Sequence, residues 1–284
     1  GRLHGAGEVT IDVAQVYPTT LSQFRLEADR QITLGAATAP STAPLSAAGQ
    51  LSLAAPIIDH GGVLRAPFGT LAFEGNTVNL RDGSVSSVSG AGLLVPFGRT
   101  ELTGRDWAYD LVAGTNLQLF DSLPQKAVTL HATEITVAPG AQVDLRGGGD
   151  LLASEFLSGP GGSRDVLAPA NANGAFAVLP ALGTGTAPLD HQIASEASIA
   201  AGELVWLGGV PGLPAGYYTK LPARYALLPG AFLVTPSTAV ADVSAGFQQV
   251  QALGDYLVAG RDARALTTGV AAAPRTGLFN VQSG

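Results

Sequence analysis

The segment TLAFEGNTVNLRDGSVSSVSGAGLLVP, residues 70–96, decides the fold. Apolar side chains alternate with other residues in short triplets such as Leu71-x-Phe73 and Val78-x-Leu80, and strands of this kind begin at 71, 78, 85 and 93. Because side chains two residues apart share one face of a strand, each triplet can bury that face. Steps of seven or eight residues leave room for one short strand and one tight turn, which indicates a chain that changes direction after every strand.

The same spacing returns in KAVTLHATEITVAPGAQVDLRG, residues 126–147, where strands begin at 128, 135 and 143. Over longer distances, triplets begin at 32, 51, 71, 93, 117 and 135. A fixed period of roughly 20 residues is typical of solenoids. We therefore predict an all-β fold, a three-faced parallel β-helix with about 20–22 residues per coil. An antiparallel sandwich or barrel is the alternative, but its hairpins usually join longer strands.

The regular pattern covers residues 1–150, with a loop-rich excursion expected at 98–111. Residues 151–284 are rich in Gly, Pro and aromatic residues and are predicted to form a second region, a β extension with loops. We expect this region to rejoin the coil at 225–234 and 254–258. The last residues, 267–284, read as a tail that frays or pairs with a neighbouring subunit.

Composition excludes several classes of protein. The chain has 15 Lys and Arg against 22 Asp and Glu, a formal net charge of −7, which argues against a general nucleic-acid binder. It contains no Cys, so disulfides and thiolate zinc sites are excluded. The longest uncharged stretch, 166–189, is interrupted by Pro and Gly and predicts no membrane span. The start, GRLHGAGEVT, has neither Met nor an apolar signal segment, and we expect the chain to be a piece of a longer precursor.

We expect no catalytic, cofactor-binding or metal-binding residues. The histidines show no metal-ligand spacing, being His4, His60, His131 and His191. Some β-helix proteins cleave polysaccharides with paired carboxylates, but the acidic residues nearest the predicted strands form no dense pair: Glu74, Asp82, Asp144, Asp150 and Glu155. Three Arg-Asp dipeptides, at 105–106, 164–165 and 261–262, are expected to anchor loops.

Aromatic residues concentrate in two places, and they are the candidates for contact with a partner chain or a glycan. The six candidates are Trp107, Tyr109, Trp206, Tyr217, Tyr218 and Tyr225. If exposed, their rings could stack on sugars or on another protein. If buried, they would instead pack at the end of the coil.

Five blocks of the sequence, in order, resemble the large exoproteins of the filamentous haemagglutinin family. They are AQVYPTTLSQFRLEAD (14–29), PLSAAGQLSLAAPIIDHGGVLRAPFGTLAF (44–73), GSVSSVSGAGLLVPFG (83–98), GGGDLLASEFLSGPGGSRDVL (147–167) and LPARYALLPGAFLVTP (221–236). The blocks resemble a C-terminal region of uncharacterised function in such proteins. The chain shows neither the family's N-terminal secretion domain nor a recognisable toxin.

The resemblance implies a right-handed parallel β-helix that is secreted through a partner transporter in the outer membrane of a Gram-negative bacterium, that is, two-partner secretion. It also implies a place on the cell surface and a role in adhesion. The absence of cysteine agrees with export through the oxidising periplasm. We expect a structural rod that self-associates head-to-tail or laterally, or that binds a glycan or protein on a host cell. The alternatives are a glycan-active β-helix enzyme and a passive stalk that carries a toxin or binding tip.

Overall fold

A computed structural model describes residues 1–101, 104–110, 117–160, 162–168, 171–184, 186, 199–237, 243–263 and 277–284. Within these residues the secondary structure consists of β-strands and one short 3-10 helix, η1 (Ala223–Leu227). The predicted all-β class is confirmed. In this part of the chain, no helix is long and apolar enough to cross a membrane.

The chain divides into two compact units. The N-terminal unit comprises Gly1–Phe97 and Phe120–Leu152, and the C-terminal unit comprises Gly98–Leu119 and Ala153–Gly284. Each unit has its own cluster of buried apolar side chains.

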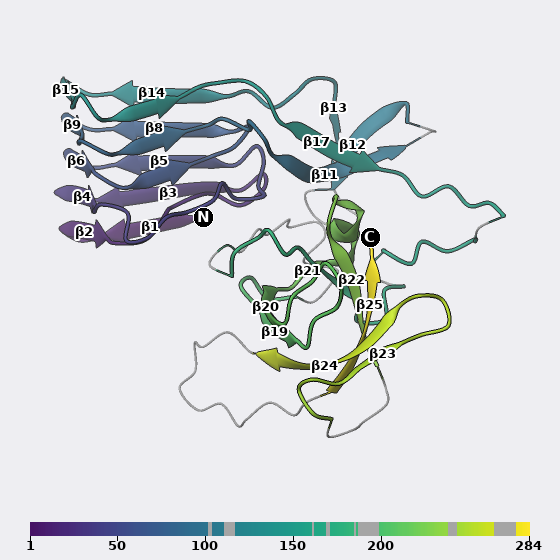
Figure 1. Cartoon of the computed structure of the whole chain (residues 1–284). Coiled ribbons are helices and arrows are strands. Elements are labelled where there is room, and N and C mark those ends of the chain that lie inside the picture. The colour runs from purple at the N-terminus through teal and green to yellow at the C-terminus, as the bar shows by residue number, and fades with distance from the viewer. Residues whose placement is uncertain are drawn as a thin grey trace. The chain divides into compact units, whose positions relative to one another are not determined.

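Three sheets of parallel strands form the N-terminal unit (Figure 1). The first sheet, in spatial order, contains β1 (Arg2–Gly5), β3 (Gln23–Ala28), β5 (Gln50–Ala54), β8 (Thr70–Glu74) and β14 (Ala127–His131). The second contains β2 (Glu8–Ile11), β4 (Gln31–Leu34), β6 (Ile57–His60), β9 (Thr77–Leu80) and β15 (Glu134–Val137). The third contains β7 (Val63–Arg65), β10 (Val85–Ser87) and β16 (Gln142–Asp144).

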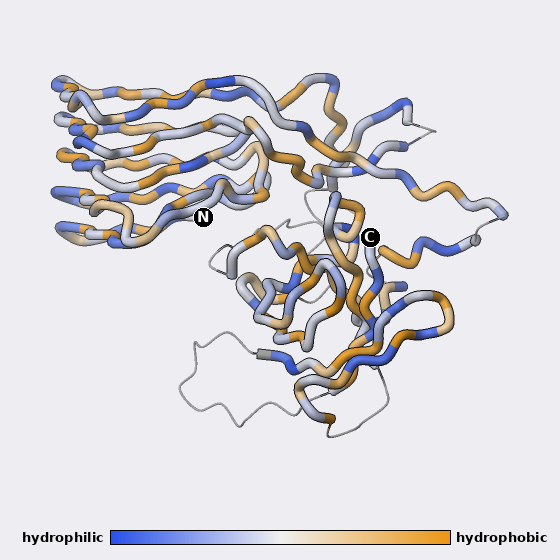
Figure 2. The backbone as a smooth tube through the Cα atoms, viewed as in Figure 1, coloured by the Kyte–Doolittle hydropathy of each residue, from blue (hydrophilic) through white to orange (hydrophobic). Residues whose placement is uncertain are grey.

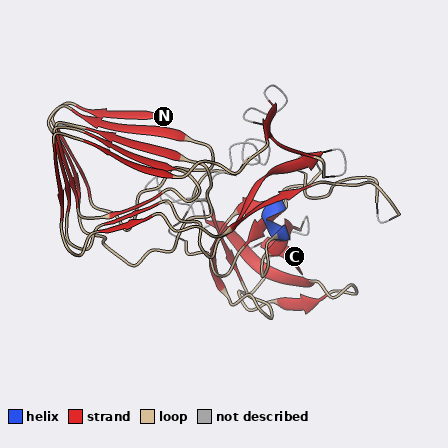
Figure 3. Cartoon of the chain, turned by 90° about the horizontal axis from the view of Figure 1, so that it is seen from above, coloured by secondary structure: helices blue, strands red, loops and turns tan. Residues whose placement is uncertain are grey.

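The later turns, β5–β7, β8–β10 and β14–β16, pass through the three sheets in the same order, whereas the first two turns contribute only β1, β2 and β3, β4 to the first and second sheets. Successive turns stack on one another, and Figure 3 shows this unit from above. In the second sheet, for example, Val9 pairs with Ile32, Ile32 with Ile58, and Ile58 with Val78. These partners are 23, 26 and 20 residues apart. Two of these spacings exceed the predicted coil length because the corner segments between strands vary in length.

Alternation along each strand directs one set of side chains inward. Inward positions of neighbouring turns fall in register and form columns, one of which runs Leu26, Leu53 and Phe73. All three side chains are buried. Figure 2 shows the same alternation of apolar and polar residues along the strands. Burial of these columns is the main stabilising term of the unit, at roughly 25 cal/mol for each Å² of apolar surface removed from water.

Close stacking of the corners requires glycine at specific positions. A Cβ atom at Gly69 would lie 2.0 Å from the carbonyl oxygen of Gly49 in the preceding turn. The two corners approach so closely because Thr70 donates its backbone N–H to that same carbonyl, 3.0 Å away. Glycine here serves the approach of one turn to the next rather than an unusual φ angle.

Two predicted coil strands do not belong to the stack. The strands expected at 93 and 117 are β11 (Leu94–Glu101) and β13 (Leu117–Phe120), which lie with β12 (Asp106–Asp110) and β17 (Asp150–Ser154) in a separate four-stranded sheet. Meanwhile β14 pairs directly with β8, so the chain between β10 and β14 is an insertion. The spacing of the apolar triplets gave a wrong prediction here, because an inserted strand with the same length and alternation has the same sequence pattern as a coil strand.

The expected loop at 98–111 is also wrong in part. Within it, residues 99–101 of β11 pair antiparallel with residues 106–108 of β12. Leu111 lies outside the described residues.

The C-terminal unit contains an eight-stranded antiparallel sheet. Its strands are β18 (Phe176–Val178), β19 (Leu204–Leu207), β20 (Gly216–Thr219), β21 (Leu221–Pro222), β22 (Phe232–Pro236), β23 (Gln248–Val250), β24 (Tyr256–Ala263) and β25 (Gly277–Ser283). Two prolines of this region lie where they remove no central ladder bond: Pro222 is on a strand at the end of the sheet order, and Pro236 ends β22.

Antiparallel pairing overturns two predictions for this region. The segments at 225–234 and 254–258 were expected to rejoin the coil, but β22 pairs with β18 and β25, and β24 pairs with β19, β23 and β25. The expected tail ends in β25, a central strand of this sheet; residues 264–276 lie outside the described part. Leu278, Phe279 and Val281 of β25 are buried, so residues 277–283 are held within this sheet and do not form a frayed end.

Candidate functional site

Three of the six aromatic candidates are buried in the C-terminal unit. Tyr109 and Tyr225 are fully buried, and Tyr218 is nearly so. The hydroxyl of Tyr218 donates a hydrogen bond to the carbonyl oxygen of Pro214, and burial raises the pKa of this phenol. These rings stabilise the unit and do not present a face to a ligand.

A fourth candidate, Trp107, lies on β12 and is half-buried. It is the register partner of Thr100 on β11. Trp107 therefore belongs to the hairpin of β11 and β12 rather than to the strands that carry Trp206 and Tyr217.

The remaining two candidates, Trp206 and Tyr217, are brought together on neighbouring strands. Trp206 of β19 is the register partner of Tyr217 of β20 on one side and of Arg261 of β24 on the other. We call these three residues the aromatic–arginine cluster. The sequence separates them by up to 55 positions, from Trp206 to Arg261, and only the antiparallel pairing places them side by side.

Arg261 lies over both aromatic rings. Its Cζ atom is 5.2 Å from the ring centroid of Trp206 and 5.9 Å from that of Tyr217. Its Nη2 donates a hydrogen bond to the Tyr217 hydroxyl, 3.1 Å away. Cation–π contacts of this kind contribute about 0.5–1 kcal/mol at exposed sites, so the cluster holds a defined arrangement at the surface.

Sequence reasoning missed Arg261 as a member of this cluster. Its dipeptide with Asp262 was expected to anchor a loop, but both residues lie within β24. Because side chains alternate along a strand, the two point to opposite faces: Arg261 joins the cluster and Asp262 forms an ion pair with Lys220, at 2.6 Å between Oδ1 and Nζ. Only knowledge that 256–263 is a strand could have supplied this result.

Lys220, between β20 and β21, has a side chain that is only 10% exposed. Its Nζ also contacts Glu203 Oε1 at 2.8 Å and lies 5.0 Å from the ring centroid of Phe176. With two carboxylates and an aromatic ring around it, the ammonium group is used structurally.

The alternation of β19 explains why the cluster is accessible. Val205 and Leu207 are fully buried on one face of the strand, so Trp206 between them must lie on the other. Tyr217 is 46% exposed. An aromatic ring with one polar end can stack on the apolar face of a sugar or on a side chain, while Arg261 can donate hydrogen bonds to its oxygen atoms.

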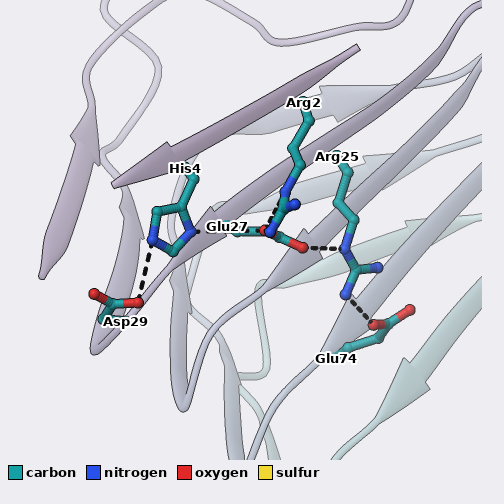
Figure 4. Close-up of polar contacts among 6 residues, drawn as sticks. All are labelled: Arg2, His4, Arg25, Glu27, Asp29 and Glu74. Carbon is teal, nitrogen blue, oxygen red and sulfur yellow. Dashed lines mark hydrogen bonds and ion pairs between the residues drawn. The ribbon is translucent and has the colours of Figure 1, made fainter. Parts of the chain in front are cut away.

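A second surface, on the N-terminal unit, carries a network of charges across the first sheet (Figure 4). Arg25 Nε lies 2.5 Å from Glu27 Oε1, and its Nη2 lies 2.8 Å from Glu74 Oε2. Arg2 also binds Glu27, with Nε 2.6 Å from Oε2. These residues meet because β1, β3, β5 and β8 lie side by side in parallel register with alternate side chains pointing outward, and Arg25 of β3 reaches Glu74 of β8 across β5.

The arginines of this network hold the carboxylates in their charged form. Hydrogen bonds from Arg25 and then from Arg2 lower the pKa of Glu27. A hydrogen bond from Arg25 lowers the pKa of Glu74, and one from Arg146 lowers the pKa of Asp144 to about 2. A general acid for glycoside cleavage needs a raised pKa, so these three carboxylates are unsuited to that role.

The other acidic candidates are placed differently. Glu155 accepts a hydrogen bond from the backbone N–H of Gly104 at 2.8 Å. Asp82 and Asp150 are exposed. The structure does not bring the five candidates together as a carboxylate pair.

Histidines and metal ligands give no site in the described part of the chain. No group of three or more His, Cys, Asp or Glu residues there is arranged to hold a metal ion. His60 is fully buried, His4 contacts Glu27 and Asp29 at 3.6 and 3.3 Å, and His131 is exposed. His191 lies outside the described residues.

A shallow hollow of about 630 Å³ occurs in the C-terminal unit beside β22, β24 and β25. Its one charged lining residue is Asp255, whose Oδ2 accepts a hydrogen bond from Gln282 Nε2 at 2.6 Å. None of the six aromatic candidates lines it.

Comparisons with known proteins give no identification: no family model, no curated protein and no solved structure matches the chain.

Proposed function

We propose that this chain is a segment of a secreted bacterial surface exoprotein, in which the N-terminal unit forms part of a stiff rod and the C-terminal unit presents a contact surface. The observation that supports the rod is the parallel register of successive turns over continuous aliphatic columns. In such an arrangement every turn makes its backbone hydrogen bonds to the turns on either side. Each added turn therefore lengthens the stack along one axis, as a rod requires.

We propose further that the stack is a right-handed three-faced β-helix. Connections between parallel strands of one sheet are right-handed in about 98% of cases, which favours this hand. The same architecture is implied by the resemblance of the sequence to filamentous haemagglutinin-like exoproteins, and so is export through an outer-membrane partner transporter to the surface of a Gram-negative cell.

Adhesion is favoured over glycan cleavage by the chemistry of the two surfaces. Glu27, Glu74 and Asp144 are paired with arginines and have lowered pKa values. The aromatic–arginine cluster, by contrast, offers rings and hydrogen-bond donors without a nucleophile or an acid. Such a surface suits binding to a sugar or to a protein side chain.

A binding assay tests this function. The purified chain is applied to a panel of surface glycans and to intact host-type cells, and release of reducing or unsaturated sugar is measured in parallel. We expect binding without sugar release. Sugar release would support the glycan-active enzyme instead, and an absence of binding to every glycan and cell would leave the passive stalk as the better reading.

Substitution of Tyr217 locates the contact surface. Tyr217→Ser should reduce binding because it removes one ring of the aromatic–arginine cluster and the hydrogen-bond partner of Arg261. Leu227→Ser is the matched control, since Leu227 has the same exposed fraction of 46% in the same unit and lies outside the cluster. Equal loss of binding in both variants would contradict a role for the cluster.

A further inference from the structure

The last turn of the stack, formed by β14, β15 and β16, exposes side chains at positions that the turn before it buries. We call this turn the trailing end. Ile135 and Val137 occupy the register positions of Val78 and Leu80, which are buried, yet their exposed fractions are 44% and 54%. Val143 on β16 shows the same exposure, at 43%. The trailing end is thus an aliphatic surface with the spacing of an interior layer.

An internal segment of the sequence forms this surface. After β16 the chain enters β17, which pairs with β11 in a different sheet. Among the described residues, β14, β15 and β16 are each the last strand of their sheet. All three strands therefore present an edge that can accept a further strand.

The backbone groups of the trailing end alternate between paired and unpaired. Ala127, Glu134 and Gln142 donate their backbone N–H groups to the preceding turn. Since bonded residues alternate along a parallel strand, the backbone groups of the residues between them point to the unpaired side. The same residues direct their side chains inward, because their register partners in the preceding turn are buried. They are Val128 and Leu130 on β14, Ile135 and Val137 on β15, and Val143 on β16.

We propose that the trailing end binds the trailing end of a second copy of this chain, across a two-fold axis perpendicular to the stack. Such an axis reverses the direction of every strand, so the two copies pair their edges antiparallel. It lays one strand on its own counterpart and exchanges the other two. The contact uses one surface twice and therefore closes as a dimer. This inference goes beyond the proposed function and does not depend on it.

Three two-fold axes are possible, one through each strand, and they differ in the charges that they bring together. The comparison is made with the strands fully overlapped and their unpaired backbone groups facing one another. An axis through β14 pairs β15 with β16 and places Glu134 opposite Asp144, which is unfavourable. An axis through β15 places no acidic residue opposite a basic one. An axis through β16 pairs β14 with β15 and places His131 opposite Glu134, twice by symmetry, so this axis is favoured.

The axis through β16 satisfies side chains and backbone together. Inward aliphatic residues of β14 lie opposite those of β15, and their unpaired backbone groups can exchange N–H···O bonds. Val143 lies on the axis, opposite its own counterpart. Thr–Thr pairs and pairs of opposite charge are favourable across antiparallel strands. The pairs between β14 and β15 are Val128 with Val137, Thr129 with Thr136, Leu130 with Ile135, and His131 with Glu134.

The imidazole–carboxylate pair gives the contact its specificity. His131 and Glu134 are both exposed in the single chain. An imidazole carries at least one N–H in either protonation state, so His131 can donate a hydrogen bond to Glu134 of the second copy. Glu74, the register partner of His131 on its own chain, is bound by Arg25.

Sedimentation velocity on the full chain tests this pairing with two charge changes. Glu134→Lys places an ammonium group opposite His131, and His131→Glu places two carboxylates opposite each other. Each variant alone should raise the dissociation constant of the dimer about tenfold, because two symmetric pairs become unfavourable. An equimolar mixture of the two variants should form a heterodimer as readily as the wild type dimerises, since every pair then joins an acid to a base.

Two further variants serve as controls for folding and position. The double variant His131→Glu, Glu134→Lys should dimerise like the wild type, which would show that neither change prevents folding. Glu8→Lys makes the same charge reversal at the first residue of β2, which lies in the same sheet and the same register column as Glu134. It should dimerise like the wild type because β2 lies outside the contact.

Self-crosslinking locates the two-fold axis. The chain contains no Cys, so a single introduced thiol reports one position. In Val143→Cys the two Cα atoms should lie about 5.5 Å apart, within the range of a disulfide, and oxidation should give a covalent dimer on a non-reducing gel. Leu145→Cys is the matched control: the native side chain is 56% exposed, but its counterpart lies roughly 13 Å away along the strand. It should remain monomeric on the same gel.

Other outcomes overturn the proposal. A wild-type chain that stays monomeric at all concentrations forms no such contact. Association that is unchanged in both Glu134→Lys and His131→Glu uses another surface. Equal crosslinking of Val143→Cys and Leu145→Cys would contradict the axis through β16.

Discussion

At the scale of single residues, His60 departs from the chemistry of its neighbours. It occupies an inward column between Leu34 and Leu80 and is fully buried. Nε2 lies 3.3 Å from the Val85 carbonyl oxygen, and the ring centroid is 5.8 Å from that of Phe73. Burial lowers the pKa of His60 to about 4. The folded chain therefore holds this ring neutral at pH values where the unfolded chain protonates it.

The consequence is a loss of stability on acidification. The unfolded chain binds this proton below the ordinary histidine pKa of 6.5, whereas the folded chain does so only near pH 4. The contribution is complete above pH 6.5 and falls by about 3 kcal/mol as the pH drops to 4. His60→Leu should remove most of the slope that urea unfolding measures between pH 7 and 5, above the range in which the carboxylates with lowered pKa values are protonated in the unfolded chain. The exposed His131→Leu should keep it, and an unchanged slope in His60→Leu would contradict the assignment.

At the scale of elements, a strand is stabilised in proportion to the turns that cover it. β8 has β5 on one side and β14 on the other, while β15 has only β9. Phe73 of β8 is fully buried and Val137 of β15 is 54% exposed. An inward position is thus a core site in the middle of the stack and a surface site at its end.

Truncation at the two positions should differ accordingly. Phe73→Ala should cost about 3–5 kcal/mol because it leaves a cavity between two covering turns. Val137→Ala should cost less than about 1 kcal/mol, because it removes little buried surface. Urea denaturation of the monomeric protein at low concentration measures both. Similar costs at the two sites would contradict the exposure of Val137 on β15.

At the scale of the whole molecule, the chain carries few charges that could oppose association by electrostatic repulsion between molecules. Charged residues make up 13% of the chain, the formal net charge is −7 and the isoelectric point is about 5.0. A net charge near zero promotes association of proteins in solution. Exposed aliphatic side chains such as Ile135 and Val137 add to this tendency.

Light scattering should therefore rise to a maximum near pH 5. At pH 7 the net negative charge opposes association, and 0.5 M salt should weaken that opposition by screening. The measurement is made in parallel on His60→Leu, so that scattering caused by acid unfolding is separated from scattering by the folded chain. A maximum that disappears in His60→Leu would mean that unfolding, rather than net charge, drives it.

The regular strands of the N-terminal unit could be predicted because local sequence specifies them. Triplets such as Val78-x-Leu80 and Ile135-x-Val137 carry the alternation of a half-buried strand, and each of these is a strand in the structure. The insertion was not predictable in the same way. Residues 94–101 and 117–120 have strand-like sequences as well, and nothing local states which sheet a strand will join.

The candidate site was predictable only in part, for a related reason. Trp206 and Tyr217 stand out by residue type, but Tyr218 and Tyr225 do so equally and are buried. Exposure depends on which face of its strand a residue occupies, and the cluster depends on Arg261, 44 positions after Tyr217. Neither the exposure of a ring nor its contact with Arg261 can be predicted from a short segment of the chain.

The amino-acid sequence by itself determined that the chain is all-β, that strands of the N-terminal half are short and separated by tight turns, and which of their side chains face inward. These features depend on interactions between residues close together in the chain. The tertiary structure alone decided that β14 follows β8 in the ladder and that residues 277–283 form a central antiparallel strand. Strand pairing joins distant segments through backbone groups that every residue shares, so the choice of partner is made by the packing of the whole unit.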